Sequence, residues 1–280
     1  QGPRMIRVTP STPIALDERF SVEFAYAGAP TPRRSRWGTI GWEELEDGAL
    51  VAAQPTGAPT WFPCNDRPDD KATYRIAVTT DAAYSVVATG ERVSLGRAGG
   101  TATWVFEQPA PTPTYLVAVQ IGRYVETIVD LDGVPGAVHH PRALSVPVRT
   151  AFADLPEMMR VFQRAFGPYP FARYDVVVTA DALEIPLEAQ GMATFGSNHL
   201  KGSEERLIAH ELAHQWFGNS VGLAHWRDIW LNEGFACYAE WIWSEATGGP
   251  SVAACAAFHH AMLQASRQDL LLSDPGPDLM

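Results

Sequence analysis

Short runs of alternating apolar and polar residues dominate the first half of the chain. A period of two with many β-branched residues is typical of strands that bury one face. Glycine and proline clusters separate these runs, and such clusters favour turns. We therefore expect strands at residues 21–26, 74–79, 84–88, 102–106 and 115–120.

The second half of the chain changes to a helical period. Residues 151–166 carry apolar side chains at helical spacing opposite a charged face, namely Leu155, Met158, Met159, Phe162 and Phe166. Residues 174–179 are typical of a buried strand. Helical periodicity returns over residues 203–217, 228–246 and 251–272. The patterns predict an α+β multi-domain protein, with a β-rich sandwich over residues 1–140 and an α+β domain over residues 141–280.

The composition narrows the classes of partner. The chain has 280 residues, with 21 Lys and Arg against 32 Asp and Glu, and a formal net charge of −11. This balance argues against nucleic acid, because phosphate contacts need clustered basic side chains. No apolar run approaches the roughly 18 residues of a membrane-spanning helix. Three cysteines without a Cys-x-x-Cys pair favour a reducing compartment, so we expect a cytoplasmic protein and leave a secreted form open.

The segment His210-Glu211-Leu212-Ala213-His214 carries the candidate chemistry. On a helix, residues four apart share a face, with Cβ atoms about 5–6 Å apart. Two imidazoles at this spacing can bind one Zn²⁺, and the glutamate between them can reach a water on the metal. We interpret His210 and His214 as zinc ligands and Glu211 as the general base. The alternative is an amphipathic helix with two surface histidines.

A catalytic zinc needs a third protein ligand and an open position for water. Glu233 is the candidate, with 18 residues between it and His214. That separation allows one helix to end, a loop to reverse the chain and a second helix to present the carboxylate. Asn232 and Glu240 are candidates to orient the zinc histidines, and the alternatives are a helix-end polar group and a surface acid.

The remaining histidines offer weaker signals. The pairs at residues 139–140 and 259–260 are adjacent and cannot share one helical face, so we expect both pairs to be exposed.

Residues 210–219 (HELAHQWFGN) and 230–236 (WLNEGFA) resemble the catalytic signature of the aminopeptidase N-type zinc peptidases, which are gluzincins and include leukotriene hydrolase. In the first half, residues 61–68, Lys71-Ala72 and residues 114–119 resemble further segments of that family. The resemblance implies a saddle-shaped β-rich domain followed by a thermolysin-like zinc peptidase domain. It also implies one Zn²⁺ per chain.

The same family carries a Gly-x-Met-Glu-Asn segment whose glutamate binds the free α-amine of the substrate. The corresponding residues here are 185–189 (IPLEA), so the resemblance implies amine binding by Glu188, although three neighbouring residues differ. Gln54 lies where family members place a second amine-binding Glu or Gln. A turn-facing amide beside Pro55 is the alternative.

The resemblance therefore implies a zinc-dependent aminopeptidase that hydrolyses the N-terminal peptide bond with a metal-activated water and Glu211 as general base. Its partners would be peptides with a free N-terminus, without nucleic acid or a membrane span, and the chain would be a monomer. Family members stabilise the oxyanion with a tyrosine whose sequence context Tyr238 lacks, so we expect a fragment of reduced activity. The alternatives are a zinc endopeptidase and a peptidase-like scaffold that binds peptides without turnover.

Overall fold

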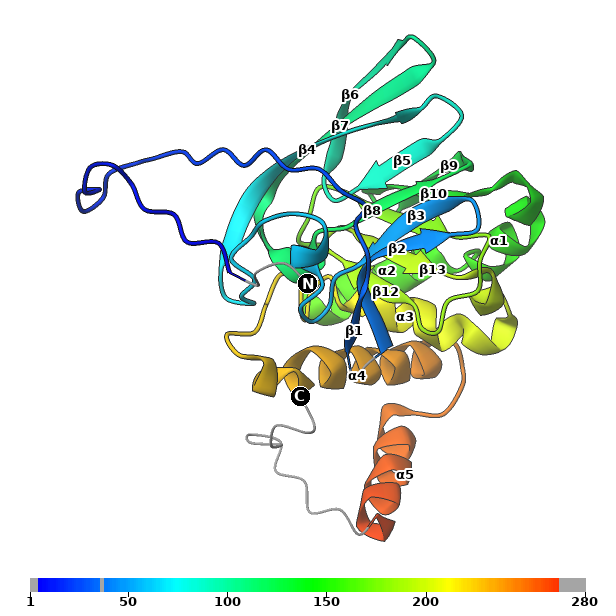
Figure 1. Cartoon of the computed structure of the whole chain (residues 1–280). Helices are drawn as coiled ribbons and strands as arrows, with labels where there is room; N and C mark the ends of the chain where they lie inside the picture. Colours follow the sequence, from blue (N-terminus) through cyan, green and yellow to red (C-terminus); the bar gives the residue numbers. More distant parts are fainter. Residues whose placement is uncertain (1–4, 36–37, 267–280) are drawn as a thin grey trace.

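The computed structural model describes residues 5–35 and 38–266 (Figure 1). Two antiparallel sheets come from the first half of the chain. The three-stranded sheet, which projects from the rest of the molecule, has the order β4 (Lys71–Asp81), β7 (Thr101–Pro113), β6 (Glu91–Ala98). The five-stranded sheet has the order β1 (Arg33–Ser35), β2 (Gly38–Leu45), β3 (Gly48–Ala52), β8 (Val119–Gly122), β5 (Ser85–Ala88).

The third sheet is mixed and belongs mostly to the second half. Its order is β12 (Leu187–Ala189), β13 (Met192–Phe195), β11 (Tyr174–Val178), β10 (Val134–Pro141), β9 (Tyr124–Leu131). The central strand β11 is parallel to both neighbours, whereas β9 and β12 pair antiparallel at the two edges. Strand pairing thus places residues 124–141 in the sheet of the second half, and a domain boundary at residue 140 stays a prediction.

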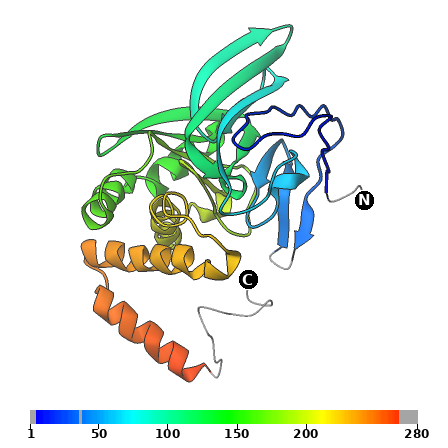
Figure 2. The same ribbon diagram turned by 90° about the vertical axis from the view of Figure 1, so that its left-hand side faces the viewer.

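Five α-helices lie in the described part of the second half. They are α1 (Ser145–Ala151), α2 (Leu155–Phe166), α3 (Glu205–Ala213), α4 (Trp230–Ala246) and α5 (Val252–Ala265). In both views α5 lies on the far side of α4 from the sheets, and in Figure 2 α3 crosses above α4. No helix of the described residues is long and apolar enough to cross a membrane.

The larger hydrophobic core lies between α2, α3, α4 and the third sheet. The apolar face of α2 is buried as its spacing predicts, through Leu155, Met158, Met159 and Phe162, and it packs in one cluster with residues of β13, α3 and α4. Gly167 ends α2 with a φ of +95°, a conformation that glycine adopts without the steric cost of a side chain. This core fixes the end of α3 relative to α4.

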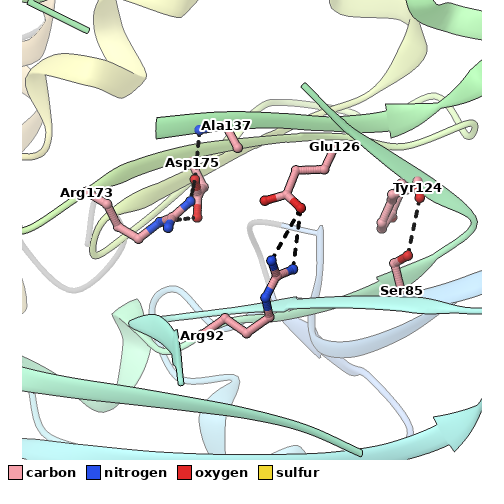
Figure 3. Close-up of polar contacts among 7 residues, drawn as sticks. All are labelled: Ser85, Arg92, Tyr124, Glu126, Ala137, Arg173 and Asp175. Carbon is pink, nitrogen blue, oxygen red and sulfur yellow. Dashed lines mark hydrogen bonds and ion pairs between the residues drawn. The ribbon is translucent and has the colours of Figure 1, made fainter. Parts of the chain in front are cut away.

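Polar contacts join the first-half sheets to the edge of the third sheet (Figure 3). Arg92 on β6 donates to Glu126 on β9 at 3.4 and 3.5 Å, and the Ser85 hydroxyl on β5 donates to the Tyr124 carbonyl at 3.2 Å. The two halves therefore meet along β9.

The predicted α+β class is confirmed, with a β-rich first half and an α+β second half. The strands predicted near residues 74–79, 84–88, 102–106 and 174–179 correspond to β4, β5, β7 and β11. The last three predicted helices correspond to α3, α4 and α5, although residues 267–272 lie outside the described residues.

Three sequence predictions are wrong. Residues 21–26 form no strand, and Phe24 and Tyr26 are 42% and 64% exposed, because alternation makes a strand only where a neighbouring strand supplies hydrogen bonds. The segment 115–120 starts in a 3-10 turn and becomes a strand only at Val119. His139 and His140 are buried in β10, which lies inside the sheet between β9 and β11, whereas residues 259–260 on α5 are exposed as predicted.

Candidate active site

His210 and His214 lie one turn apart at the end of α3, and their ring centroids are 4.8 Å apart. The opposite side of this helix is buried in the larger core through Ile208, Ala209 and Leu212. Burial of that apolar face turns both imidazoles toward α4, whose first turn carries Glu233.

Glu233 meets both histidines through one carboxylate oxygen. Its Oε2 lies 3.2 Å from Nε2 of His210 and 3.8 Å from Nε2 of His214. One ligand atom from each of the three residues lies within 4.8 Å of the other two. The structure therefore brings the three predicted metal ligands together from two helices, and a single ion could contact all three.

The other nitrogen of each imidazole has its own partner. Nδ1 of His210 lies 2.8 Å from Oε1 of Glu240, and Nδ1 of His214 lies 3.1 Å from the carbonyl oxygen of Phe217. Both partners are acceptors, so each ring donates from Nδ1, and loss of the proton from Nε2 on the Glu233 side would leave the neutral tautomer protonated at Nδ1. That tautomer is the one a metal ligand requires.

The surroundings of His210 favour positive charge. Burial lowers the pKa of His210, but hydrogen bonds with Cys237, Glu233 and Glu240 outweigh it and raise that pKa to about 12. A divalent cation would be stabilised by the same groups. Two imidazoles with one carboxylate form a donor set that suits catalytic zinc and leaves one coordination position open. The residues present therefore fit a zinc ion.

Two further groups of possible ligands share residues with this set. They are His210, Cys237 and Glu240, and Glu188, Glu211 and His214. The first group would use the Nδ1 side of His210, which Glu240 already accepts from. The set with Glu233 is the one of the three that uses Nε2 of both histidines.

Glu211 is 4% exposed, and a carboxylate oxygen of Glu211 lies within 4.8 Å of a ligand atom of Glu188 and of His214. Its Oε2 has no hydrogen-bond partner within the described residues. Burial, followed by the charge of Glu188, raises the pKa of Glu211 well above its usual range. A carboxyl group whose pKa is raised in this way suits proton transfer near neutral pH.

A cavity of about 710 Å³ lies beside the predicted ligands. Glu233, Glu188 and Gln54 all line it, so the structure brings a predicted metal ligand and both predicted amine-binding residues to one space. Glu43 and Glu184 add two more carboxylates, and no Lys, Arg or His occurs among the described residues of the lining. This wall suits a positively charged group, while the rest of the lining is mainly apolar.

Asn232 does not pair with a ligand histidine in the way that Glu240 does. Its side chain is 2% exposed and hydrogen-bonds with the Tyr115 hydroxyl. It also borders Gly218, where an added Cβ would lie 3.1 Å from its Nδ2. Gly218 thus lies between Asn232 and His214. The role of Asn232 in orienting a zinc histidine stays a prediction.

Sequence reasoning gave no role to several groups that support the site. These are the Phe217 carbonyl, the buried amides of Gln215 and Asn219, the Tyr115 hydroxyl and the Lys71 ammonium. All five residues lie in segments that carried the family resemblance, which was the available signal. Their partners are mostly backbone groups, and a sequence pattern does not report those.

Comparisons with known proteins agree with this geometry. The sequence matches the peptidase M1 N-terminal domain over residues 46–116 and the peptidase family M1 domain over residues 150–274. Aminopeptidase M1-A of Oryza sativa subsp. japonica is 30% identical over 214 residues, which cover 71% of this chain and 24% of that protein. Aminopeptidase A of Gloydius brevicauda is 32% identical over 211 residues, which cover 69% and 22%. The chain thus spans about a quarter of the length of these curated relatives.

Solved structures give the same result. An M1 zinc metallopeptidase from Deinococcus radiodurans is 32% identical with a TM-score of 0.77, and the match covers 89% of this chain and 57% of that one. A mutant M1 zinc metallopeptidase from the same organism, bound to a Tyr-Ser-Ala substrate, is 31% identical with a TM-score of 0.79 and the same coverage. Two matching domains, the relatives and the shared fold place this chain in peptidase family M1.

Proposed function

We propose that this chain is a zinc-dependent aminopeptidase, which hydrolyses the N-terminal peptide bond of peptides. One observation carries the proposal: Glu233, which faces Nε2 of both histidines, lines the same carboxylate-walled cavity as Glu188 and Gln54. A metal centre and a binding place for a free ammonium group are therefore contiguous. The M1 zinc metallopeptidases and aminopeptidases similar to this chain support the same activity.

The cofactor is Zn²⁺, held by His210, His214 and Glu233. When bound, zinc lowers the pKa of a water molecule and polarises the scissile carbonyl. Glu240 and the Phe217 carbonyl keep the two imidazoles in the tautomer that presents Nε2.

Three side chains bind the substrate and transfer the proton. Glu188 accepts hydrogen bonds from the α-ammonium group of the substrate, assisted by Gln54, and this contact sets the first peptide bond beside Glu211. Glu211 takes a proton from the attacking water and gives it to the leaving amine. Its raised pKa suits both transfers, because a base near the operating pH can also return the proton.

The cavity also explains why a blocked N-terminus would be rejected. An N-acetyl group removes the positive charge that the carboxylate wall favours and adds bulk at Glu188. An endopeptidase would show no such rejection, and a binding scaffold would show no turnover. The monomeric state and the cytoplasmic location expected from the sequence stay predictions.

The test compares a leucyl p-nitroanilide with its N-acetyl counterpart, together with metal analysis of the same protein. We expect one zinc per chain and release of nitroaniline from the free substrate alone. Glu211→Gln should retain zinc and lower kcat by about 10²–10⁴-fold. Equal cleavage of both substrates would favour an endopeptidase, and zinc binding without cleavage would favour the scaffold.

A further inference from the structure

The tip of the β12–β13 hairpin is held by the residue that follows His214. Gln215 is 0% exposed, and its Nε2 donates to the carbonyl of Ala189 at 3.1 Å. Its Oε1 accepts from the backbone N–H of Gly191 at 2.8 Å. One amide therefore holds the two backbone groups on either side of Gln190, and this requires a side chain with a donor and an acceptor at the same end.

Asn219 holds the same carbonyl from a second position. Its Nδ2 donates to the Ala189 oxygen at 2.9 Å, and the residue is 1% exposed. Two buried amides from the segment after α3 thus converge on one backbone oxygen of the hairpin. The family has an asparagine side chain where this chain has Ala189, but the contact uses the main chain and does not depend on that difference.

The segment after α3 is itself fixed from the first half of the chain. Nζ of Lys71 on β4 donates to the carbonyl oxygens of Asn219 and Ser220, both at 3.3 Å. The Tyr115 hydroxyl donates to the carbonyl of Gly218 at 3.3 Å. The backbone that carries the Asn219 amide is therefore hydrogen-bonded to two separate segments of the first half.

These contacts connect the two ends of the proposed site by a short path. Ala189 directly follows Glu188, and Gln215 directly follows His214. The hairpin has other anchors, from Gln190 N–H to the Leu116 carbonyl and from Asp175 N–H to the Gly191 carbonyl, but these lead to other parts of the fold. Gln215 and Asn219 tie the hairpin to the segment that carries His214.

We propose that Gln215, assisted by Asn219, is a positioning residue that sets the separation between the Glu188 carboxylate and the zinc-binding histidines. The inference rests on the proposed function, because a peptide has a fixed distance between its α-amine and its first carbonyl. A displacement of about 1 Å at such a site can cost about 10²-fold in rate. Loss of the amide should therefore uncouple amine recognition from metal binding.

The experiment measures two dissociation constants by calorimetry on zinc-loaded protein. The probes are leucine hydroxamate and the matching hydroxamate that lacks the α-amine. Both probes chelate the metal, so the Kd of the amine-free hydroxamate divided by the Kd of leucine hydroxamate reports amine recognition. This ratio does not depend on the fraction of folded protein. In Gln215→Met, which retains the volume but loses both hydrogen bonds, we expect this ratio to fall about tenfold at unchanged zinc stoichiometry.

Gln163→Met is the matched control. Gln163 also holds two backbone groups with both ends of its amide, since its Oε1 accepts from Tyr169 N–H after α2 and its Nε2 donates to the Asp132 carbonyl between β9 and β10, both at 3.2 Å. Neither Asp132 nor Tyr169 lines the cavity or belongs to the predicted metal set, so the variant should lose stability and retain the parental ratio.

Asn219→Ala keeps the inference testable if Gln215→Met does not fold, and it should lower the ratio by a smaller factor. A parental ratio in both Gln215→Met and Asn219→Ala would overturn the positioning role and leave the proposed function intact. Equal Kd values for the two probes in the unsubstituted protein would overturn the proposed function, and this inference with it.

Discussion

Oε1 of Glu240 on α4 lies 2.8 Å from Nδ1 of His210 on α3. The second oxygen of Glu240 lies 3.3 Å from a guanidinium nitrogen of Arg206, so both oxygens of this largely buried carboxylate have partners. A carboxylate behind a zinc histidine orients the ring and raises the basicity of the ligating nitrogen.

We expect Glu240→Gln to weaken zinc binding by about 10–100-fold, because an amide keeps the shape of the side chain but not its charge. Competition with a chelator of known affinity measures the effect. Glu245→Gln, an exposed position on the same helix, is the control and should bind zinc like the parent. Equal zinc affinity in Glu240→Gln and Glu245→Gln would contradict the orienting role of Glu240.

Gly218 provides a second prediction, since its φ is +120° and an added Cβ would lie 3.1 Å from Nδ2 of Asn232 and 3.4 Å from Nδ1 of His214. We expect Gly218→Ala to lose about 1–3 kcal/mol of unfolding free energy through backbone strain. Crowding at His214 should also weaken zinc binding. Urea unfolding and chelator competition measure the two effects.

Gly100→Ala separates strain from crowding. Gly100 has a φ of +84°, and nothing lies within 4 Å of an added Cβ. This variant should lose stability but bind zinc like the parent. If both glycine variants bind zinc equally, crowding at His214 is not the cause.

The burial of His139 should make the free energy of unfolding depend on pH. Burial lowers the pKa of His139 below its usual 6.5. The charges of Asp175 and Glu126 oppose this shift, and those of Arg173 and Arg92 add to it; Figure 3 draws these four charged side chains. The unfolded chain therefore takes up a proton at higher pH than the folded one. The stability contribution is fully present above about pH 6.5 and is lost as the pH falls toward the lower folded pKa.

We expect His139→Gln to reduce the loss of unfolding free energy between pH 7 and pH 5, by at most about 1.4 kcal/mol per pH unit. Urea unfolding of chelator-treated protein measures it, because zinc binding has its own pH dependence. His260→Gln on α5 controls for the replacement of a histidine. The same change of slope in both variants would argue against burial of His139 as the cause.

The helices and the metal set were largely predictable because their signals are local. His210 and His214 share a helical face by their spacing alone, and α2 buries four of the five residues that its period selects, with Phe166 partly buried. The segment 21–26 shows the limit of such signals, since an alternating pattern does not supply the neighbour that a strand needs.

By itself, the sequence determined the division into a β-rich and an α+β half, the histidine pair with its intervening glutamate, and the carboxylate on the following helix. The tertiary structure decided that Glu240 faces Nδ1 of His210, that Gln215 holds the Ala189 carbonyl and that His139 is buried. The reason is physical. Helical and strand periods depend on neighbours a few residues apart. The contacts of Glu240 and Gln215 join residues 26 to 30 positions apart, and the burial of His139 depends on the two strands that flank β10. Only packing of the whole chain sets these contacts and this burial.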